Sequence, residues 1–132
     1  MMTLITSKIA MAKDLGMHGN LFGGNMLSWI DEAAATLASR IVQTASLVTL
    51  KMEEVVFKKA VKQGFQILIY GEVHKIGSTS ITLSIEARKH NVYSGEEDVV
   101  CSTKITFVKI DEHGSAIPIS PHIRKKWENG EF

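Results

Sequence analysis

The stretch that decides the fold is HGNLFGGNMLSWIDEAAA, residues 18–35. The stretch begins within a glycine-rich loop, residues 14–24, and continues into an alanine-rich segment, residues 24–41. Alanine is the best helix former. Apolar residues of this segment recur at offsets of three and four, which places them on one face of a helix. They are Leu27, Ile30, Ala34, Leu37 and Ile41. The stretch therefore predicts one long amphipathic helix that starts at a pair of glycines.

The pattern changes to a period of two outside this helix. Strands are predicted at residues 3–11, 47–58, 65–74, 79–88 and 99–110. The clearest is 79–88, where apolar and polar residues alternate as they do in a strand with one buried face. Consecutive strands joined by short turns are mostly antiparallel. We expect an α+β domain with the helix packed on one face of an antiparallel sheet. One helix covers only part of such a sheet, so the exposed edges predict a homo-oligomer.

Composition narrows the class of protein. The 132 residues, 45% of them hydrophobic and 22% charged, suit one globular domain with its own core. A net charge of +1 argues against a general nucleic-acid binder. The single cysteine, Cys101, excludes an internal disulfide and suits a reducing compartment. With no signal peptide and no apolar run near the roughly 20 residues that span a bilayer, we expect a cytoplasmic protein without a membrane partner.

Several kinds of reactive centre have no support in the sequence. The five histidines do not pair with one another or with the cysteine at metal-ligand spacing, so no metal site is predicted. There is no serine nucleophile elbow and no phosphate-binding glycine loop. Cys101 falls within a predicted strand and is expected to be a buried, inert thiol.

The loop and helix contain the residues that suit acyl chemistry. Gly23 and Gly24 stand where the helix starts, and a helix start presents unpaired backbone N–H groups that can polarise a carbonyl. Asp31 lies beside the apolar face of the helix, where a carboxylate is costly unless it is paired or used. The pattern alone leaves open whether Asp31 is a functional base or, with Glu32, part of a solvated acidic pair. It also leaves open whether Asn20 supplies an amide to the site or is an ordinary turn residue.

Residues 19–34, GNLFGGNMLSWIDEAA, resemble the signature of the hotdog-fold acyl-CoA thioesterases, most closely the YciA-type and cytosolic acyl-CoA hydrolase group. The resemblance continues through Val48-Thr49, residues 57–64 and residues 75–80, and ends near residues 106–111. It implies a hotdog fold, in which a curved antiparallel sheet wraps a long central helix. It also implies that two hotdogs pair through their sheets and that the dimers assemble, most commonly into a homohexamer.

The resemblance implies a site at the subunit interface. Asp31 of one subunit would be the catalytic carboxylate, Asn20 would come from the facing subunit, and the backbone of Gly23 and Gly24 would polarise the thioester carbonyl. The reaction would be hydrolysis of acyl-CoA to free CoA and a carboxylic acid, without metal or cofactor, because coenzyme A is part of the substrate. Whether Asp31 activates water or attacks to form a mixed anhydride stays open. Glu32 is the alternative carboxylate.

Coenzyme A carries a phosphorylated nucleotide, so basic and turn residues should border the site. The candidates are Lys58, Lys59, Lys75, Gly77, Ser78 and Ser80. Members of the family often carry an arginine where this chain has Ser78. Either backbone amides and the hydroxyls of Ser78 and Ser80 suffice here, or Arg88 or Lys89 takes the place of that arginine. The thioesterase domain is expected to span residues 1–118. The basic tail, residues 119–132, could cover the nucleotide, but a loosely ordered terminus is the stronger expectation.

Two other functions remain as alternatives. A non-catalytic acyl-CoA-binding protein would keep the fold and need no Asp31, and the presence of both Asn20 and Asp31 speaks against it. A dehydratase acting on 3-hydroxyacyl thioesters would pair a carboxylate with a histidine. His18 is close in sequence, but its position does not match that arrangement.

Overall fold

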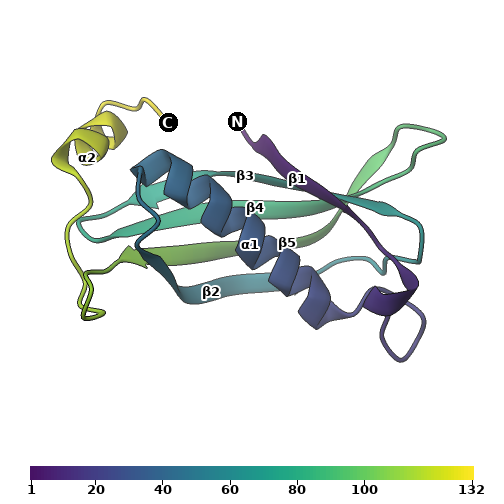
Figure 1. Ribbon diagram of the computed structural model, residues 1–132. Coiled ribbons are helices and arrows are strands. Elements are labelled where there is room, and N and C mark those ends of the chain that lie inside the picture. Colours follow the sequence, from purple (N-terminus) through teal and green to yellow (C-terminus); the bar gives the residue numbers. More distant parts are fainter.

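The structure, a computed structural model, describes all 132 residues. Its elements are β1 (Thr3–Ile9), a 3-10 turn (Ala12–Asp14), α1 (Gly23–Val42), β2 (Leu47–Phe57), β3 (Gln66–Ile76), β4 (Ser80–His90), β5 (Glu97–Lys109) and α2 (Pro121–Glu128) (Figure 1). The long helix and the five strands lie within two residues of their predicted boundaries. Neither helix combines the length and apolar character needed to cross a bilayer.

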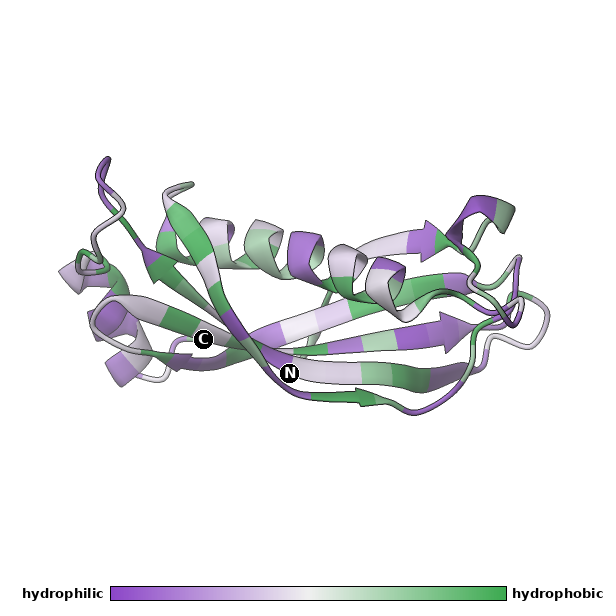
Figure 2. Cartoon of the chain, turned by 90° about the horizontal axis from the view of Figure 1, so that it is seen from below, coloured by the Kyte–Doolittle hydropathy of each residue, from purple (hydrophilic) through white to green (hydrophobic).

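The strands form a single antiparallel sheet in the order β1-β3-β4-β5-β2, which confirms the predicted α+β class. Helix α1 lies across one face of this sheet, so the molecule has two layers (Figures 1 and 2). The other face carries no helix. Both β1 and β2 are edge strands, each paired on one side only.

Strands β2 and β3 follow each other in the chain but are not neighbours in the sheet. Strand β2 pairs with β5, and β3 lies on the other side of β4. The connecting residues 58–65 cross the end of the sheet, held by backbone hydrogen bonds from Lys58 to Val100, from Leu21 to Val61 and from Gly64 to Ala10. This crossing leaves β2 at the open edge, next to the side of α1 that carries Asp31.

The core lies between α1 and the sheet. Helix α1 buries Met26, Ile30, Ala33, Ala34, Ala38 and Val42. Of the predicted apolar face, Ile30 and Ala34 are fully buried, whereas Leu27, Leu37 and Ile41 are only partly buried. Compared with the predicted face, the buried face of the helix is therefore rotated toward the alanine residues. Their small side chains let the helix axis approach the sheet closely. Below Leu37 the sheet has Gly71, where an added Cβ would lie 3.1 Å from the Leu37 side chain.

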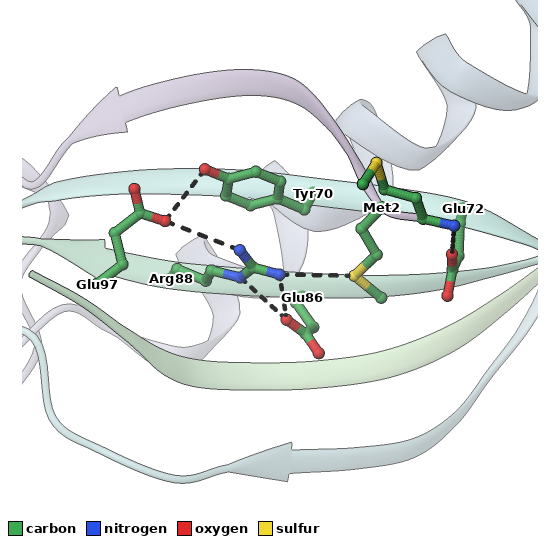
Figure 3. A network of polar contacts seen from close by, with 7 residues as sticks. Met2, Tyr70, Glu72, Glu86, Arg88 and Glu97 are labelled. Atoms are coloured by element: carbon green, nitrogen blue, oxygen red, sulfur yellow. Dashed lines mark hydrogen bonds and ion pairs between the residues drawn. The ribbon is translucent and has the colours of Figure 1, made fainter.

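The outer face of the sheet is polar, as the alternation in residues 79–88 predicts. The side chains of Ile81, Leu83, Ile85 and Ala87 are buried toward α1, and the intervening ones are half-buried on the outer face. The Arg88 guanidinium lies 2.9 Å from Glu86, 3.8 Å from Glu97 and 4.0 Å from the centre of the Tyr70 ring (Figure 3). The Tyr70 hydroxyl donates to Glu97 at 3.1 Å. Arg88 is thus fully engaged in a surface network.

The C-terminal segment is ordered as helix α2, so the expectation of a loose terminus is wrong. Ile119 is fully buried, Ile123 is 1% exposed, and Trp127 packs against the same core. Helix α2 lies against β3 at the end of the sheet where α1 ends (Figure 1). Three apolar side chains at intervals of four residues anchor it despite the basic residues between them. The division of the chain at residue 118 stays a prediction.

Candidate active site

The start of α1 presents free hydrogen-bond donors. Phe22, the residue before the helix, has extended backbone angles, and its carbonyl accepts from the N–H groups of Asn25 and Met26. No side chain caps this end, and no acidic residue lies in the first turn. The N–H groups of Gly23 and Gly24 have no hydrogen-bond partner. These donors, together with the positive end of the helix dipole, suit an oxygen that gains negative charge.

Two aromatic rings lie against these glycines. A Cβ on Gly23 would lie 3.2 Å from the Phe57 ring, and a Cβ on Gly24 would lie 2.8 Å from the Phe22 ring. A side chain at either position would therefore displace one of these rings. Both rings are more than half exposed, with Phe57 at 53% and Phe22 at 56%. They form apolar walls beside the polar helix start.

Asp31 lies two turns into α1, at the margin between the helix and β2. Its carboxylate is half-buried and accepts a hydrogen bond of 2.8 Å from the hydroxyl of Thr49. No cation pairs with it, although a basic partner is the usual companion of a partly buried carboxylate. Glu32 is exposed and faces a hollow beside β1, lined also by Lys8 and Arg40. The two carboxylates diverge, so Asp31 is not half of a solvated acidic pair.

A groove brings together several of the predicted residues at the helix start. Its volume is about 370 Å³, and its lining consists of Asn20, Leu21, Gly23, Phe57, Lys58, Lys59 and Ala60. The side-chain amide of Asn20 makes no hydrogen bond within the chain, although the backbone of Asn20 bridges to Lys62. The ammonium of Lys59 pairs with Asp98 at 3.3 Å, whereas Lys58 has no acidic partner. A polar amide, an unpaired cation and helix donors therefore meet on this groove.

The remaining predicted residues lie at the opposite end of the sheet. Lys75, Gly77, Ser78 and Ser80 form the end of β3 and its turn into β4, and the N–H of Gly77 donates to the Ser80 carbonyl at 2.8 Å. Asp31 is seven residues after Gly24, about 10 Å along the helix. One subunit therefore does not bring Asp31, Asn20 and this turn together.

Within one subunit, Arg88 and Lys89 do not lie near Ser78. Both residues lie near the far end of β4, where Lys89 pairs with Ile67 at the start of β3. The Arg88 guanidinium is engaged with Glu86, and the Lys89 ammonium lies 5.1 Å from the centre of the Phe65 ring. Within one subunit neither residue reaches the turn, because the length of β4 separates them from it, so the hypothesis that one of them replaces the arginine stays a prediction.

The structure also shows the state of two other kinds of reactive group, the Cys101 thiol and a metal-binding cluster. Cys101 is fully buried, as predicted, and burial raises the pKa of its thiol, which keeps the sulfur protonated and unsuited to attack. No cluster of three or more histidine, cysteine, aspartate or glutamate side chains could hold a metal ion.

The sequence did not predict the bond from Thr49 to Asp31. The resemblance includes Thr49 but gives it no role, because Thr49 meets Asp31 only once β2 lies beside α1.

Comparisons with known proteins agree with this arrangement. Residues 18–96 match the family model of the thioesterase superfamily. An uncharacterized acyl-CoA thioester hydrolase of Bacillus subtilis is 29% identical, with 80% of this chain aligned to 61% of that protein. The acyl-CoA thioester hydrolase YciA of Salmonella typhimurium is 29% identical over 88% of this chain and 89% of its own length.

A solved structure gives the same result for the fold. The crystal structure of a hexameric hotdog fold thioesterase of Campylobacter jejuni superposes with a TM-score of 0.82 at 34% identity, covering 92% of this chain and 93% of that one. The matched residues include the second half of the glycine-rich loop, α1 and the strand β2 that contacts it. With its fold and its signature stretch both matched, this chain belongs to the thioesterase superfamily, and its fold is the hotdog fold.

Proposed function

We propose that this protein is an acyl-CoA thioesterase that hydrolyses the thioester of acyl-CoA to free CoA and a carboxylic acid. The observation that carries the proposal is the half-buried Asp31 carboxylate, which is bonded to Thr49 and has no cation beside it. It stands on the same helix whose first two N–H groups are free. Relatives named as acyl-CoA thioester hydrolases support the choice of substrate.

The helix start would polarise the substrate. The thioester oxygen accepts hydrogen bonds from the N–H groups of Gly23 and Gly24, and these donors stabilise the negative charge that forms when the carbonyl carbon is attacked. The side-chain amide of Asn20, which has no partner within the chain, holds the water or the carbonyl in position. The rings of Phe22 and Phe57 limit access of bulk water to this point.

Asp31 would supply the base. In one route its carboxylate takes a proton from water as the water oxygen bonds to the carbonyl carbon. The C–S bond then breaks, and the CoA thiolate takes up the proton. In the other route the carboxylate itself attacks, CoA leaves, and water hydrolyses the resulting anhydride. Both routes use no metal and no cofactor.

The site would form between subunits. Asp31 and the helix start are about 10 Å apart along α1, so Asp31 of one subunit acts on a carbonyl held by Asn20 and Gly24 of the facing subunit. Strand β2 offers the surface for pairing, because its outer edge has no strand partner and it exposes apolar side chains. These are Val48, Leu50, Val55, Val56 and Phe57. The hexameric relative supports assembly of such dimers into a hexamer.

Antiparallel pairing of two β2 strands would also unite the two groups of CoA-binding residues. Ser80 pairs with Val108, and Val108 pairs with Val48 near the start of β2. Lys58 and Lys59 follow the end of β2. Antiparallel pairing places the end of one β2 beside the start of the other, so the lysines of one subunit approach the Gly77–Ser80 turn of its partner. The single buried thiol, Cys101, is consistent with a cytoplasmic location.

The test compares wild type with Asp31→Ala, Asp31→Asn and the control Glu32→Gln on acyl-CoAs from acetyl to palmitoyl, measuring release of free thiol. We expect hydrolysis by wild type and Glu32→Gln, and a loss of at least about 100-fold in both Asp31 variants while their circular dichroism stays unchanged. Binding of acyl-CoA without turnover by wild type would instead favour a non-catalytic acyl-CoA-binding protein. Full activity in folded Asp31→Ala would exclude Asp31 as the base.

A further inference from the structure

Helix α2 carries cations that none of the reaction steps above uses. They are Arg124, Lys125 and Lys126, and none of them takes part in an ion pair. Glu128 is the one acidic residue of the helix, and it too forms no ion pair. By contrast, the Arg88 guanidinium on the sheet has two carboxylate partners. The positive charge of α2 is therefore not neutralised within the subunit.

A chain of two hydrogen bonds ties one of these cations to the β3–β4 turn. The N–H of Ile119 donates to the carbonyl of Ser78 at 2.8 Å, and Nε of Arg124 donates to the carbonyl of Ile119 at 2.9 Å. Ile119 is fully buried and Ile123 nearly so, which fixes the backbone on which Arg124 stands. The guanidinium is thus held next to the turn before any ligand arrives.

The held guanidinium keeps its binding edge free. Its Nε is used by Ile119, whereas its two terminal nitrogens have no partner within the chain. A planar guanidinium with two free nitrogens matches the oxygens of a phosphate group, and fixing it in advance reduces the entropy lost on binding. The Ser78 side chain is exposed, and the turn from Gly77 to Ser80, whose Ser78 carbonyl accepts from Ile119, contains no acidic residue to repel an anion.

We propose that Arg124 and the β3–β4 turn form a binding site for a phosphate group of the nucleotide of the acyl-CoA substrate. The proposal rests on the proposed function for the identity of the ligand. Arg124 supplies the charge and the paired donors, and the Ser78 hydroxyl and nearby backbone add neutral donors. Helix α2 is thereby part of the substrate-binding surface rather than a terminal appendage.

The test compares substrates that differ only in their phosphates. Wild type, Arg124→Ala, Arg124→Lys and the control Lys8→Ala, on β1 at the sheet edge opposite β2, are assayed with acyl-CoA, with the thioester of 3′-dephospho-CoA and with acyl-pantetheine. We expect Arg124→Ala to raise KM for acyl-CoA roughly 10- to 100-fold, with kcat nearly unchanged. Arg124→Lys, which keeps the charge but loses the fork, recovers part of that loss. Acyl-pantetheine, which has no nucleotide, is hydrolysed equally by all four proteins.

The thioester of 3′-dephospho-CoA shows which phosphate group Arg124 binds. An effect of Arg124→Ala that vanishes with the 3′-dephospho thioester assigns the 3′-phosphate, whereas one that remains assigns the diphosphate. Equal losses on acyl-CoA and acyl-pantetheine would overturn the proposal, because they indicate a structural role for Arg124. So would an unchanged KM in folded Arg124→Ala.

A binding measurement separates this proposal from the proposed function. Titration calorimetry of CoA, 3′-dephospho-CoA and pantetheine needs no turnover. If wild type hydrolyses no thioester yet binds CoA more tightly than pantetheine, and Arg124→Ala loses that preference, the site stands and the enzyme assignment fails. If wild type hydrolyses acyl-CoA but Arg124→Ala keeps the preference of wild type, the site fails and the enzyme assignment stands.

Discussion

The hydroxyl of Thr49 donates to the carboxylate of Asp31 at 2.8 Å, joining the edge strand β2 to the middle of α1. This bond fixes one oxygen of the carboxylate and leaves the other free. Because nothing else within the subunit holds the Asp31 side chain, its orientation depends on a strand that also lies at the proposed subunit interface. A base held in this way has one preferred direction of attack.

Thr49→Val should therefore lower activity without loss of folding. Valine has the shape of threonine but cannot donate to Asp31, so we expect kcat to fall roughly 10-fold while KM changes little. Steady-state kinetics on one acyl-CoA measures the change. Thr3→Val, on the opposite edge strand, is the matched control and should leave kcat unchanged. If Thr49→Val keeps the kcat of wild type, the bond does not orient the base.

Gly24→Ala tests the helix start. The added methyl would lie 2.8 Å from the Phe22 ring, which is exposed enough to move aside, so the fold should survive. The methyl and the displaced ring then obstruct the approach of the thioester to the free N–H groups. We expect kcat/KM to fall roughly 100-fold, the size of effect seen when an oxyanion donor is lost. Ser28→Ala, one turn further along α1, should retain activity. An active Gly24→Ala enzyme would remove this helix start from the mechanism.

Leu50→Lys tests the β2 edge. Leu50 is 61% exposed and lies where β2 bulges out of register with β5. A lysine in the paired strands would have to be buried, so we expect light scattering to give the mass of a single chain and activity to fall to background. Circular dichroism should remain that of the folded protein. Val92→Lys, in the turn before β5, provides the control. An active oligomer of Leu50→Lys would place the interface elsewhere.

The phenol of Tyr70 should lose its proton at a higher pH than an ordinary tyrosine does. Partial burial, and then its hydrogen bond to Glu97, raise the pKa of Tyr70 above the ordinary 10.0. Since folding favours the protonated phenol, this contribution to the free energy of unfolding is complete below about pH 10 and is lost as pH rises through the raised pKa. Ultraviolet titration of Tyr93→Phe, which leaves Tyr70 as the one tyrosine, measures the midpoint. Adding Glu97→Gln should lower it, and a midpoint at 10.0 without that change would contradict the assignment.

The sequence predicts those parts of the fold that local periodicity determines. Helix α1 and the strands follow from spacing of three to four or of two, and their boundaries are close to those observed. The place of β2 in the sheet does not follow, because nothing in residues 47–58 marks β5 as its partner. The rotation of the buried face toward Ala33 and Ala38 also depends on how closely the helix can approach the sheet.

The candidate site divides in the same way. The pattern around Asp31 places it near the apolar face of α1, and the structure locates it at that margin beside β2. Its partner Thr49 is invisible to the pattern, since the two residues meet only after β2 has docked. Helix α2 was missed although its signal was present: Ile119, Ile123 and Trp127 recur at intervals of four. The basic residues of this segment led to the expectation of a loose terminus despite that apolar spacing.

The strand order has a consequence for the route by which the chain folds. Strands β3, β4 and β5 follow one another in the chain and form a meander. The two edge strands pair with segments that lie far away in the chain. Thr3 pairs with Gly71, 68 residues later, and Leu47 pairs with Lys109, 62 residues later. Closing such long loops costs entropy before any contact stabilises them. The meander should therefore nucleate, with β1 and β2 joining late. Since β2 also carries the proposed interface, its final docking and association would coincide, and the slowest refolding phase would accelerate as the protein concentration rises.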